Sequence, residues 1–258
     1  VSLSKTQLYG IILSGANLQG IDLSGAAIAY ANLENTDLTD ANLANANLAS
    51  AKLNGAKFNN ADLSGATLDL ADIKNADFTD ANLIGTSFQG AKMNRATKID
   101  EKIYLIWQLA SGKADKDLQN ADLSGANLRD ARLEGINFTG ANFTGANLGG
   151  ASFKNSDLSD ADLTNANLSN TYFKDTKIND ATQLGDKWRL VWEIANGRAG
   201  RDLRNIDLRE ANLNDVDIVD ADLSGANLAR VKLWNARLNN VNLENANLEN
   251  AQLSGANF

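Results

Sequence analysis

The feature that most constrains the fold is a period of five residues. In residues 61–83, "ADLSGATLDLADIKNADFTDANL", a large apolar residue returns every five positions from Leu63 to Leu83, and an alanine stands two positions before each. This period fits neither an amphipathic helix, which needs apolar residues three and four apart, nor a half-buried strand, which needs every second residue. A fixed period instead indicates stacked units that bury their apolar faces only against one another.

The period covers most of the chain in three runs that keep the same phase. Apolar centres recur through residues 3–93, 118–178 and 203–258, and the residue before each centre is usually Asn or Asp. The fifth position is often Gly, Asn or Asp, which tolerate a positive φ or close a turn through their own backbone. Each pentad therefore predicts a short extended piece with two inward side chains, followed by a corner.

Pentads such as "ADLSG", "ANLSN" and "ANFTG" resemble the pentapeptide repeat family, and the resemblance covers more than four fifths of the chain. It implies an all-β solenoid, a right-handed quadrilateral parallel β-helix with four pentads in each coil. Coils would lie about 4.8 Å apart, the usual distance between hydrogen-bonded strands. Residues twenty apart would then lie above one another, so we expect Phe58 to stack on Phe78 and Phe153 to stack on Phe173.

Two related segments interrupt the repeats. Residues 96–118 and 181–203 lie 85 positions apart and match at ten of 23 aligned positions. The second contains "KWRLVWEI", and the paired inserts most resemble those of cyanobacterial pentapeptide repeat proteins. The chain accordingly divides into repeat runs and helical inserts. The repeat runs are residues 1–95, 118–180 and 203–258, and the inserts are residues 96–117 and 181–202.

Each insert predicts one short helix. We expect Asp100 to cap a helix from about residue 101 to residue 111, with Gly112 ending it. In the second insert we expect Asp186 to act as the cap and Gly197 to end the helix.

The insert tryptophans Trp107, Trp188 and Trp192 are expected to pack the helices against the repeats. One interpretation makes each helix a lid over the open end of a stack, near Met93 or Ile178, with a new stack starting after it. Such ends expose unpaired edges and an open core. The alternative is one continuous stack with helices braced on its side. The phase of the repeats fits both, because each gap is a whole number of pentads.

The composition excludes most catalytic chemistry. The chain has no His, no Cys and no Pro, so it lacks Ser-His-Asp and Cys-His arrangements and the commonest metal ligand. Acidic pairs such as Asp37 with Asp40 follow from the repeat itself. We therefore predict no enzymatic activity, no catalytic or cofactor-binding residue and no metal site, with calcium the one cation that oxygen ligands would suit.

Charge and hydropathy restrict the partners. The net charge of −8 is spread thinly, since each repeat run carries about −3, and this argues against free nucleic acid as a ligand. No apolar run approaches the roughly 18 residues of a membrane span. The chain starts in repeat phase at Leu3 without an initiator Met, so we expect upstream residues to have been removed. Bacterial cytoplasm, periplasm and thylakoid lumen remain open as compartments.

Four outward-facing apolar residues are candidate contacts for a partner protein: Tyr9, Tyr30, Leu70 and Trp234. Tyr30 and Leu70 are forty residues apart and so share one corner of the expected coil, and Tyr9 lies close to the same edge. Scattered exposed apolar residues are also ordinary on protein surfaces, which is the alternative interpretation.

The leading functional hypothesis is a non-enzymatic scaffold or protein interaction module that presents flat β-helix faces to an unknown protein partner. The alternative comes from the resemblance alone, because some pentapeptide repeat proteins mimic DNA and bind a DNA gyrase. The sequence predicts neither the oligomeric state nor the identity of the partner.

Overall fold

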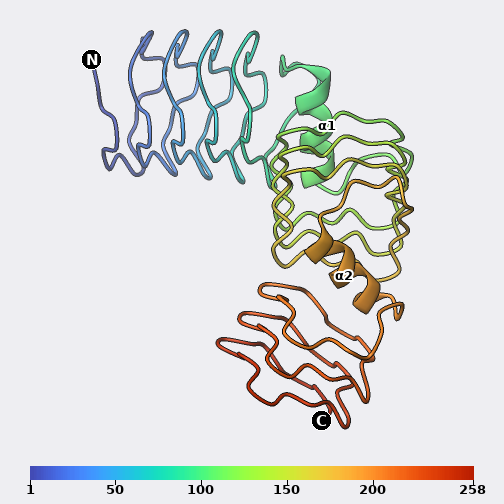
Figure 1. Ribbon diagram of the computed structural model, residues 1–258. Helices are drawn as coiled ribbons and strands as arrows, with labels where there is room; N and C mark the ends of the chain where they lie inside the picture. The colour runs from blue at the N-terminus through green and yellow to red at the C-terminus, as the bar shows by residue number, and fades with distance from the viewer. The chain divides into compact units, whose positions relative to one another are not determined.

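The computed structural model describes residues 1–258, and nearly all of the chain winds in coils (Figure 1). Its two helices are α1 (Glu101–Ala110) and α2 (Asp186–Ala195). Elsewhere the pairing consists of isolated parallel β-bridges rather than extended strands. The all-β expectation therefore takes the form of single-residue bridges repeated along the coils.

The bridges fall into three series, which we call the first, second and third coil stacks. They run from Ser2↔Asp22 to Asp77↔Lys98, from Asp117↔Asn137 to Asp162↔Gln183, and from Asp202↔Asp222 to Arg237↔Asn257. Bridged residues are 20 positions apart except at the two bridges that precede the helices. Each coil therefore contains four pentads, in agreement with the spacing expected from the sequence.

The chain forms two compact units. Unit 1 comprises Val1–Ala114 with Gly125–Leu128, and unit 2 comprises Asp115–Ser124 with Arg129–Phe258. Unit 1 holds the first coil stack and α1, whereas unit 2 holds most of the second stack, α2 and the third stack.

The core of each stack is made by the apolar centres and the small residues before them. Leu33, Leu38 and Leu43 have no exposed surface. Burial of one such side chain stabilises the fold by roughly 1.5–3 kcal/mol, and only the coils above and below provide it.

The expected phenylalanine stacks are confirmed. The rings of Phe58 and Phe78 are parallel with centroids 4.8 Å apart. Those of Phe153 and Phe173 are 6.1 Å apart and inclined by 7°.

The polar positions of the pentad build the corners. In the pentad centred on Leu38, the Asp37 carboxylate accepts the backbone N–H of Thr39 at 3.1 Å, and the N–H of Ala41 donates to the Leu38 carbonyl at 3.1 Å. Asp40, the third residue of the turn, has φ 58°. The side chain before the centre thus fixes the turn, and the fifth residue must adopt a left-handed conformation that favours Asn, Asp and Gly.

The two inserts begin differently. Asp100 is the N-cap of α1, and its carboxylate accepts the N–H of the third helical residue, as expected. The expectation for α2 was wrong, because Asp186 is already the first helical residue and the N-cap is Gly185, which has no side chain to offer. Both helices end before a glycine with positive φ, Gly112 at 65° and Gly197 at 66°.

Candidate functional site

One tryptophan of each insert is fixed to the stack that precedes it. The indole N–H of Trp107 donates to the Ala91 carbonyl at 2.8 Å, and that of Trp192 donates to the Thr176 carbonyl at 2.7 Å. The two side chains are only 6% and 5% exposed. Each bond thus pairs a backbone carbonyl of the last coil with a donor from the helix.

A cation covers each of these indoles. The Lys113 ammonium lies 4.7 Å from the ring centroid of Trp107, and the Arg198 guanidinium lies 4.8 Å from that of Trp192. Both cations come from the segment just after the helix. Each ring is therefore held between the coil edge and a positive charge, an arrangement that the ring quadrupole favours.

A second bond recurs with the same 85-residue offset. The Asn127 amide donates to the Gly85 carbonyl at 3.2 Å, and the Asn212 amide donates to the Asn170 carbonyl at 3.2 Å. In both cases an asparagine from the pentads after an insert reaches back across it. The two inserts are thus built with equivalent anchors on both sides.

The bridges in unit 2 favour the lid interpretation of α2. The second series closes at Asp162↔Gln183 before the helix, and the third opens at Asp202↔Asp222 after it. Ile178, the last apolar centre before the helix, is half-buried, two residues beyond the carbonyl that Trp192 binds. The series of bridges is therefore interrupted at α2, while one backbone bond, from the Asn170 N–H to the Glu210 carbonyl at 2.6 Å, still joins the coils on its two sides.

Trp188 sets α2 apart from α1. It is half-buried and lines a hollow of about 450 Å³ with Leu163, Leu168 and Leu184. Ile103, its counterpart in α1 by the 85-residue offset, is 8% exposed. Of the three tryptophans named from the sequence, two are buried anchors, whereas Trp188 lines this hollow with the Lys187 ammonium 4.9 Å from its ring centroid.

Tyr30 and Leu70 form what we call the apolar corner of the first coil stack. They are 70% and 63% exposed, and both have φ 61°. The side chain of Leu70 lies over Gly90 in the next coil, where an added Cβ would come within 2.8 Å of its Cδ2 atom. Two apolar residues thus occupy a corner position that favours Asn, Asp or Gly.

The other two candidate contacts lie elsewhere. Tyr9 is 61% exposed and directly precedes Gly10, which has φ 63° at the same corner position one coil before Tyr30. Trp234 is 44% exposed and belongs to unit 2, where its N–H donates to the Asn214 amide oxygen at 2.9 Å. The apolar corner is therefore a feature of unit 1 alone.

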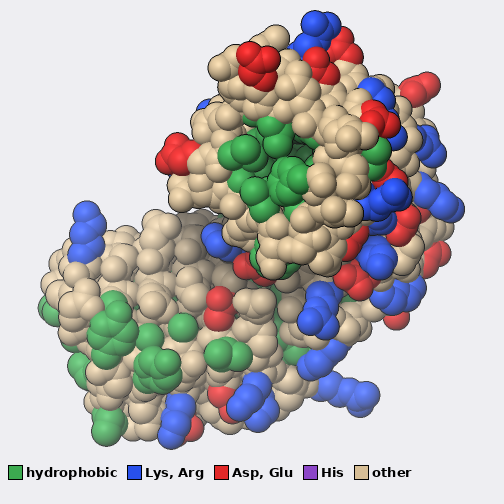
Figure 2. Space-filling model, turned by 90° about the horizontal axis from the view of Figure 1, so that it is seen from below, with side chains coloured by type: hydrophobic (Ala, Val, Ile, Leu, Met, Phe, Trp, Pro, Cys, Tyr) green, Lys and Arg blue, Asp and Glu red, His purple; other side chains and the backbone are tan.

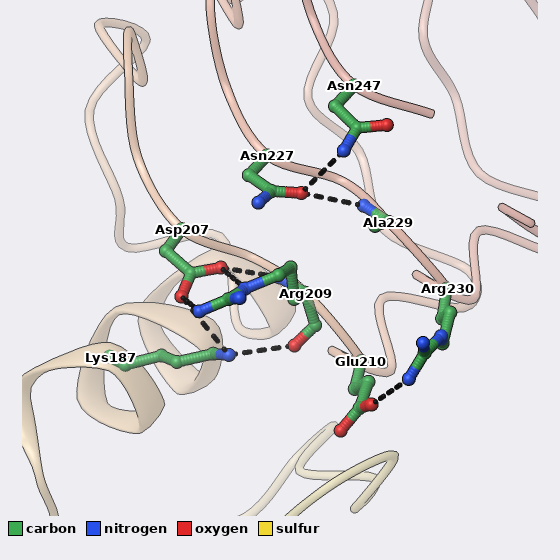
Figure 3. A network of polar contacts seen from close by, with 8 residues as sticks. All are labelled: Lys187, Asp207, Arg209, Glu210, Asn227, Ala229, Arg230 and Asn247. Atoms are coloured by element: carbon green, nitrogen blue, oxygen red, sulfur yellow. Dashed lines mark hydrogen bonds and ion pairs between the residues drawn. The ribbon is translucent and has the colours of Figure 1, made fainter. Parts of the chain in front are cut away.

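A polar hollow of about 390 Å³ lies on the third coil stack beside α2 (Figure 3). Lys187 of α2 donates to the Arg209 carbonyl at 2.8 Å and lies 3.7 Å from the Asp207 carboxylate. Arg209 in turn holds both oxygens of Asp207 with its Nε and Nη2 atoms, at 3.0 and 2.8 Å. The helix and the stack are thus joined by one ionic network.

Two further charged residues form the side of this hollow. Arg230 donates to the Glu210 carboxylate at 2.9 Å. Glu210 and Arg230 have φ 60° and 58°, and every other non-glycine residue with positive φ in the third stack is Asn or Asp. This ion pair is therefore held by two residues whose type does not suit their backbone conformation.

The hollow itself results from a small residue between two long ones. Ala229 lies 20 residues after Arg209 and 20 before Glu249, at the same position of the pentad, and all three line the space. Sequence analysis missed this site. The signals were available, namely an alanine in an otherwise long polar column and charged residues at the fifth position of two pentads.

Electrostatics keep these carboxylates ionised at neutral pH. The hydrogen bonds from Arg209 hold the pKa of Asp207 at about 2. The hydroxyl of Ser169 and the guanidinium of Arg230 lower the pKa of Glu210. The basic side chains of the hollow are consequently oriented by charged partners over the whole neutral range.

No group of three or more His, Cys, Asp or Glu side chains comes together as a metal site. Neither α1 nor α2, at ten residues each, has the length and hydrophobicity needed to cross a bilayer.

Comparison with known families matches the chain to "Pentapeptide repeats", with eight copies. The matched residues are 2–40, 41–80, 61–97, 117–155, 156–182, 199–228 and 221–258. The chain belongs to the pentapeptide repeat family. This membership implies a right-handed β-helix, and the family is generally a structural or interaction fold rather than an enzymatic one.

Solved pentapeptide repeat proteins from cyanobacteria are similar to this one. Rfr23 of Cyanothece 51142 is 38% identical over 36% of this chain and 64% of its own, with a TM-score of 0.36. HetL of Nostoc sp. strain PCC 7120, described as involved in heterocyst differentiation regulation, is 26% identical over 99% of this chain and 88% of its own, with a TM-score of 0.38. Among curated proteins no match was found.

Proposed function

We propose that this pentapeptide repeat protein is a non-enzymatic scaffold or protein interaction module. Its coils would form a right-handed quadrilateral β-helix, and residues 1–95, 118–180 and 203–258 would be its repeat runs. Residues 96–117 and 181–202 would be the inserts, held by Trp107, Trp188 and Trp192. The sides of the coils would present the binding surfaces.

The apolar corner is the observation that carries this proposal. Tyr30 and Leu70 are exposed, they stand two coils apart at one corner, and both have φ 61°. A left-handed conformation costs a residue with a Cβ roughly 1–2 kcal/mol, and exposure of an apolar side chain adds no compensation. Burial of these side chains against a partner would compensate for that cost. We include the nearby Tyr9 and the separate Trp234 as candidate contacts.

The alternative, a DNA mimic that binds a gyrase-like enzyme, has less support. Such a mimic needs a surface of one sign. Figure 2 shows Lys and Arg side chains interspersed with Asp and Glu side chains on one face. Opposite charges are also paired along the third stack, as in Arg204 with Asp202 at 2.7 Å and Arg237 with Asp217 at 2.6 Å.

Site-specific photo-cross-linking tests the proposal. A photoreactive phenylalanine analogue placed at Tyr30 or Leu70 should capture one discrete protein from an extract of the source organism. The matched control is the same analogue at Asp40, an exposed corner residue two pentads after Tyr30. Identical capture at all three positions, or none at any, would count against the apolar corner as a binding surface.

A further inference from the structure

We propose that the polar hollow on the third coil stack binds an extended acidic segment of a partner protein. The proposal rests on the proposed function in one respect, namely that the protein is a binding module. The polar hollow is a different surface from the apolar corner. Lys187, Arg209 and Arg230 would hold the acidic side chains, and Asn227 with Asn247 would hold the peptide backbone.

The two arginines are oriented, yet they keep donors for a ligand. Arg209 uses its Nε and one Nη2 hydrogen for Asp207, and Arg230 uses Nη1 for Glu210. Their side chains are 58% and 67% exposed. A guanidinium offers five N–H groups in a rigid fork that suits carboxylates, so each arginine retains several donors toward the hollow.

The two carboxylates near α2 already have basic partners, so the basic and acidic ends of the hollow differ. Asp207 and Glu210 are neutralised by the arginines, and Lys187 adds a third cation from the first turn of α2. Glu249, two coils away from Arg209, accepts a 3.3 Å hydrogen bond from the Asn250 amide. Negative groups of a ligand would therefore lie near α2 rather than near Glu249.

A pair of amides between these ends favours a peptide over a free anion. The Asn247 amide donates to the Asn227 side-chain oxygen at 3.3 Å, and that same oxygen accepts the N–H of Ala229 at 3.2 Å (Figure 3). The Asn247 oxygen accepts the backbone N–H of Glu249 at 3.0 Å, which leaves it one lone pair. That lone pair and the Asn227 N–H₂ form one acceptor and one donor that line the hollow. A peptide group matches such a pair, because it offers one acceptor and one donor.

Backbone conformation supports a binding role for this corner. Glu210 and Arg230 both have positive φ, and their ion pair lies on the wall of the hollow. Residues in unsuitable conformations cluster at sites where a partner or ligand uses the strained group. The apolar corner of the first stack likewise has residues other than Asn, Asp or Gly at the fifth pentad position with positive φ, but their side chains are apolar.

Fluorescence anisotropy tests the proposal on the full chain. The probe is a fluorescein-labelled peptide, Gly-Ser-Glu-Gly-Glu-Ser-Gly, with the Gln-for-Glu peptide as its control. We expect saturable binding of the Glu peptide that weakens with salt, about tenfold weaker binding to Arg209→Gln and Arg230→Gln, and no binding of the Gln peptide. Absence of saturable binding up to about 1 mM peptide would overturn the proposal.

Arg204→Gln is the matched control. Arg204 occupies the same pentad position one pentad earlier and holds Asp202 with the same two nitrogen atoms, at 2.7 Å each, but does not line the hollow. It should leave peptide binding unchanged. If Arg204→Gln weakens binding as much as Arg209→Gln, the peptide is held by overall charge and the proposed site is wrong.

Filling the hollow provides an independent variant. Ala229→Gln should abolish peptide binding without changing charge, and it should fold because Gln stands at the same pentad position at residues 19, 89 and 119. Competition by inorganic phosphate as strong as that by unlabelled peptide would indicate a free-anion site and contradict the peptide assignment. These results leave the cross-linking at Tyr30 and Leu70 unaffected, so failure of the hollow and failure of the proposed function are distinguishable.

Discussion

The two inserts have the same anchors but different exposed features. Trp107 and Trp192 each donate to a carbonyl sixteen residues earlier, and Asn127 and Asn212 each donate to a carbonyl 42 residues earlier. Every one of these bonds satisfies a backbone group of the coil edge. The features that the two inserts share therefore supply hydrogen-bond donors to backbone carbonyls that are left unpaired where the repeats stop.

The differences between the inserts lie at the start of the helix. α1 has the side-chain cap Asp100, whereas α2 begins after Gly185 without one. Where α1 has the buried Ile103, α2 has the half-buried Trp188, and Lys187 reaches the third stack. The comparison teaches that covering the edge and presenting a surface are separate tasks, performed by different residues of one short helix.

The largest expected effect comes from breaking both anchors. In a Trp107→Asp, Trp192→Asp double variant a carboxylate would replace each buried indole, and burial of an unpaired charge is costly enough to detach the helix. The uncovered coil edges would then pair with other molecules. Light scattering should show self-association while the far-UV circular dichroism of the coils persists.

Single variants sharpen this comparison of the two inserts. If both helices are lids, Trp107→Asp and Trp192→Asp should each self-associate, whereas Trp188→Asp, at a half-buried position, should stay monomeric. A monomeric Trp192→Asp variant would show that α2 is only braced on the side of the coils.

Core truncation beneath the inserts should come next in size. Phe78→Ala and Phe173→Ala each remove one ring of a stacked pair, and the cavity should lower the free energy of unfolding by about 3–5 kcal/mol. Gln89→Ala, at an exposed position, should change it by less than about 0.5 kcal/mol. Denaturant unfolding measures all three, and equal effects would contradict the inward placement of the rings.

Exchanging the caps tests the difference between the helices. Asp100→Ala should destabilise unit 1 by about 0.5–2 kcal/mol, because one helix N–H loses its acceptor. Gly185→Asp should stabilise α2 by a smaller amount, roughly a few tenths of a kcal/mol, because glycine is itself a tolerated N-cap. The substitution is accommodated, since the backbone there has φ −57° and ψ 150° and an added Cβ meets nothing within 4 Å. Thermal unfolding of the two variants should move in opposite directions, and shifts in the same direction would contradict the cap assignment.

The smallest effect is a pH dependence confined to unit 2. Burial, with the nearby Asp215, raises the pKa of Tyr172 from 10.0 to about 12, and its hydroxyl donates to that carboxylate at 3.2 Å. Because the folded pKa is the higher one, this contribution to stability is complete below pH 10 and is lost as pH rises through 12.

Tyr172→Phe measures this contribution. The stability difference between wild type and Tyr172→Phe should be constant up to pH 10 and should shrink between pH 10 and 12. The corresponding residue by the 85-residue offset is Ser87, so Ser87→Ala should show no such trend. A difference between wild type and Tyr172→Phe that does not change with pH would contradict the role of this bond.

Much of the fold is predictable from the sequence because the repeat is a local rule applied many times. The period of five, the Asn or Asp before each centre and the twenty-residue stacking of Phe58 on Phe78 follow from turn chemistry and burial. The N-cap of α2 was not predictable in this way, because Gly185 and Asp186 are adjacent and both residue types are common at N-caps. The choice between them depends on whether the helix begins at residue 186 or residue 187. The polar hollow depends on Lys187 meeting Arg209, a contact between an insert and a stack that no repeat rule describes.

The central claim is that the repeat supplies the fold whereas departures from it supply binding, and one pair of substitutions tests it directly. Tyr30→Asn with Leu70→Asn installs at both corners the residue that the repeat prefers there, and Ser50→Asn, between them in the same column at φ 58°, is the control. We predict that the double variant unfolds at a higher denaturant concentration and no longer captures the partner, while the control captures it normally. Capture by the double variant at the wild-type level would contradict the claim.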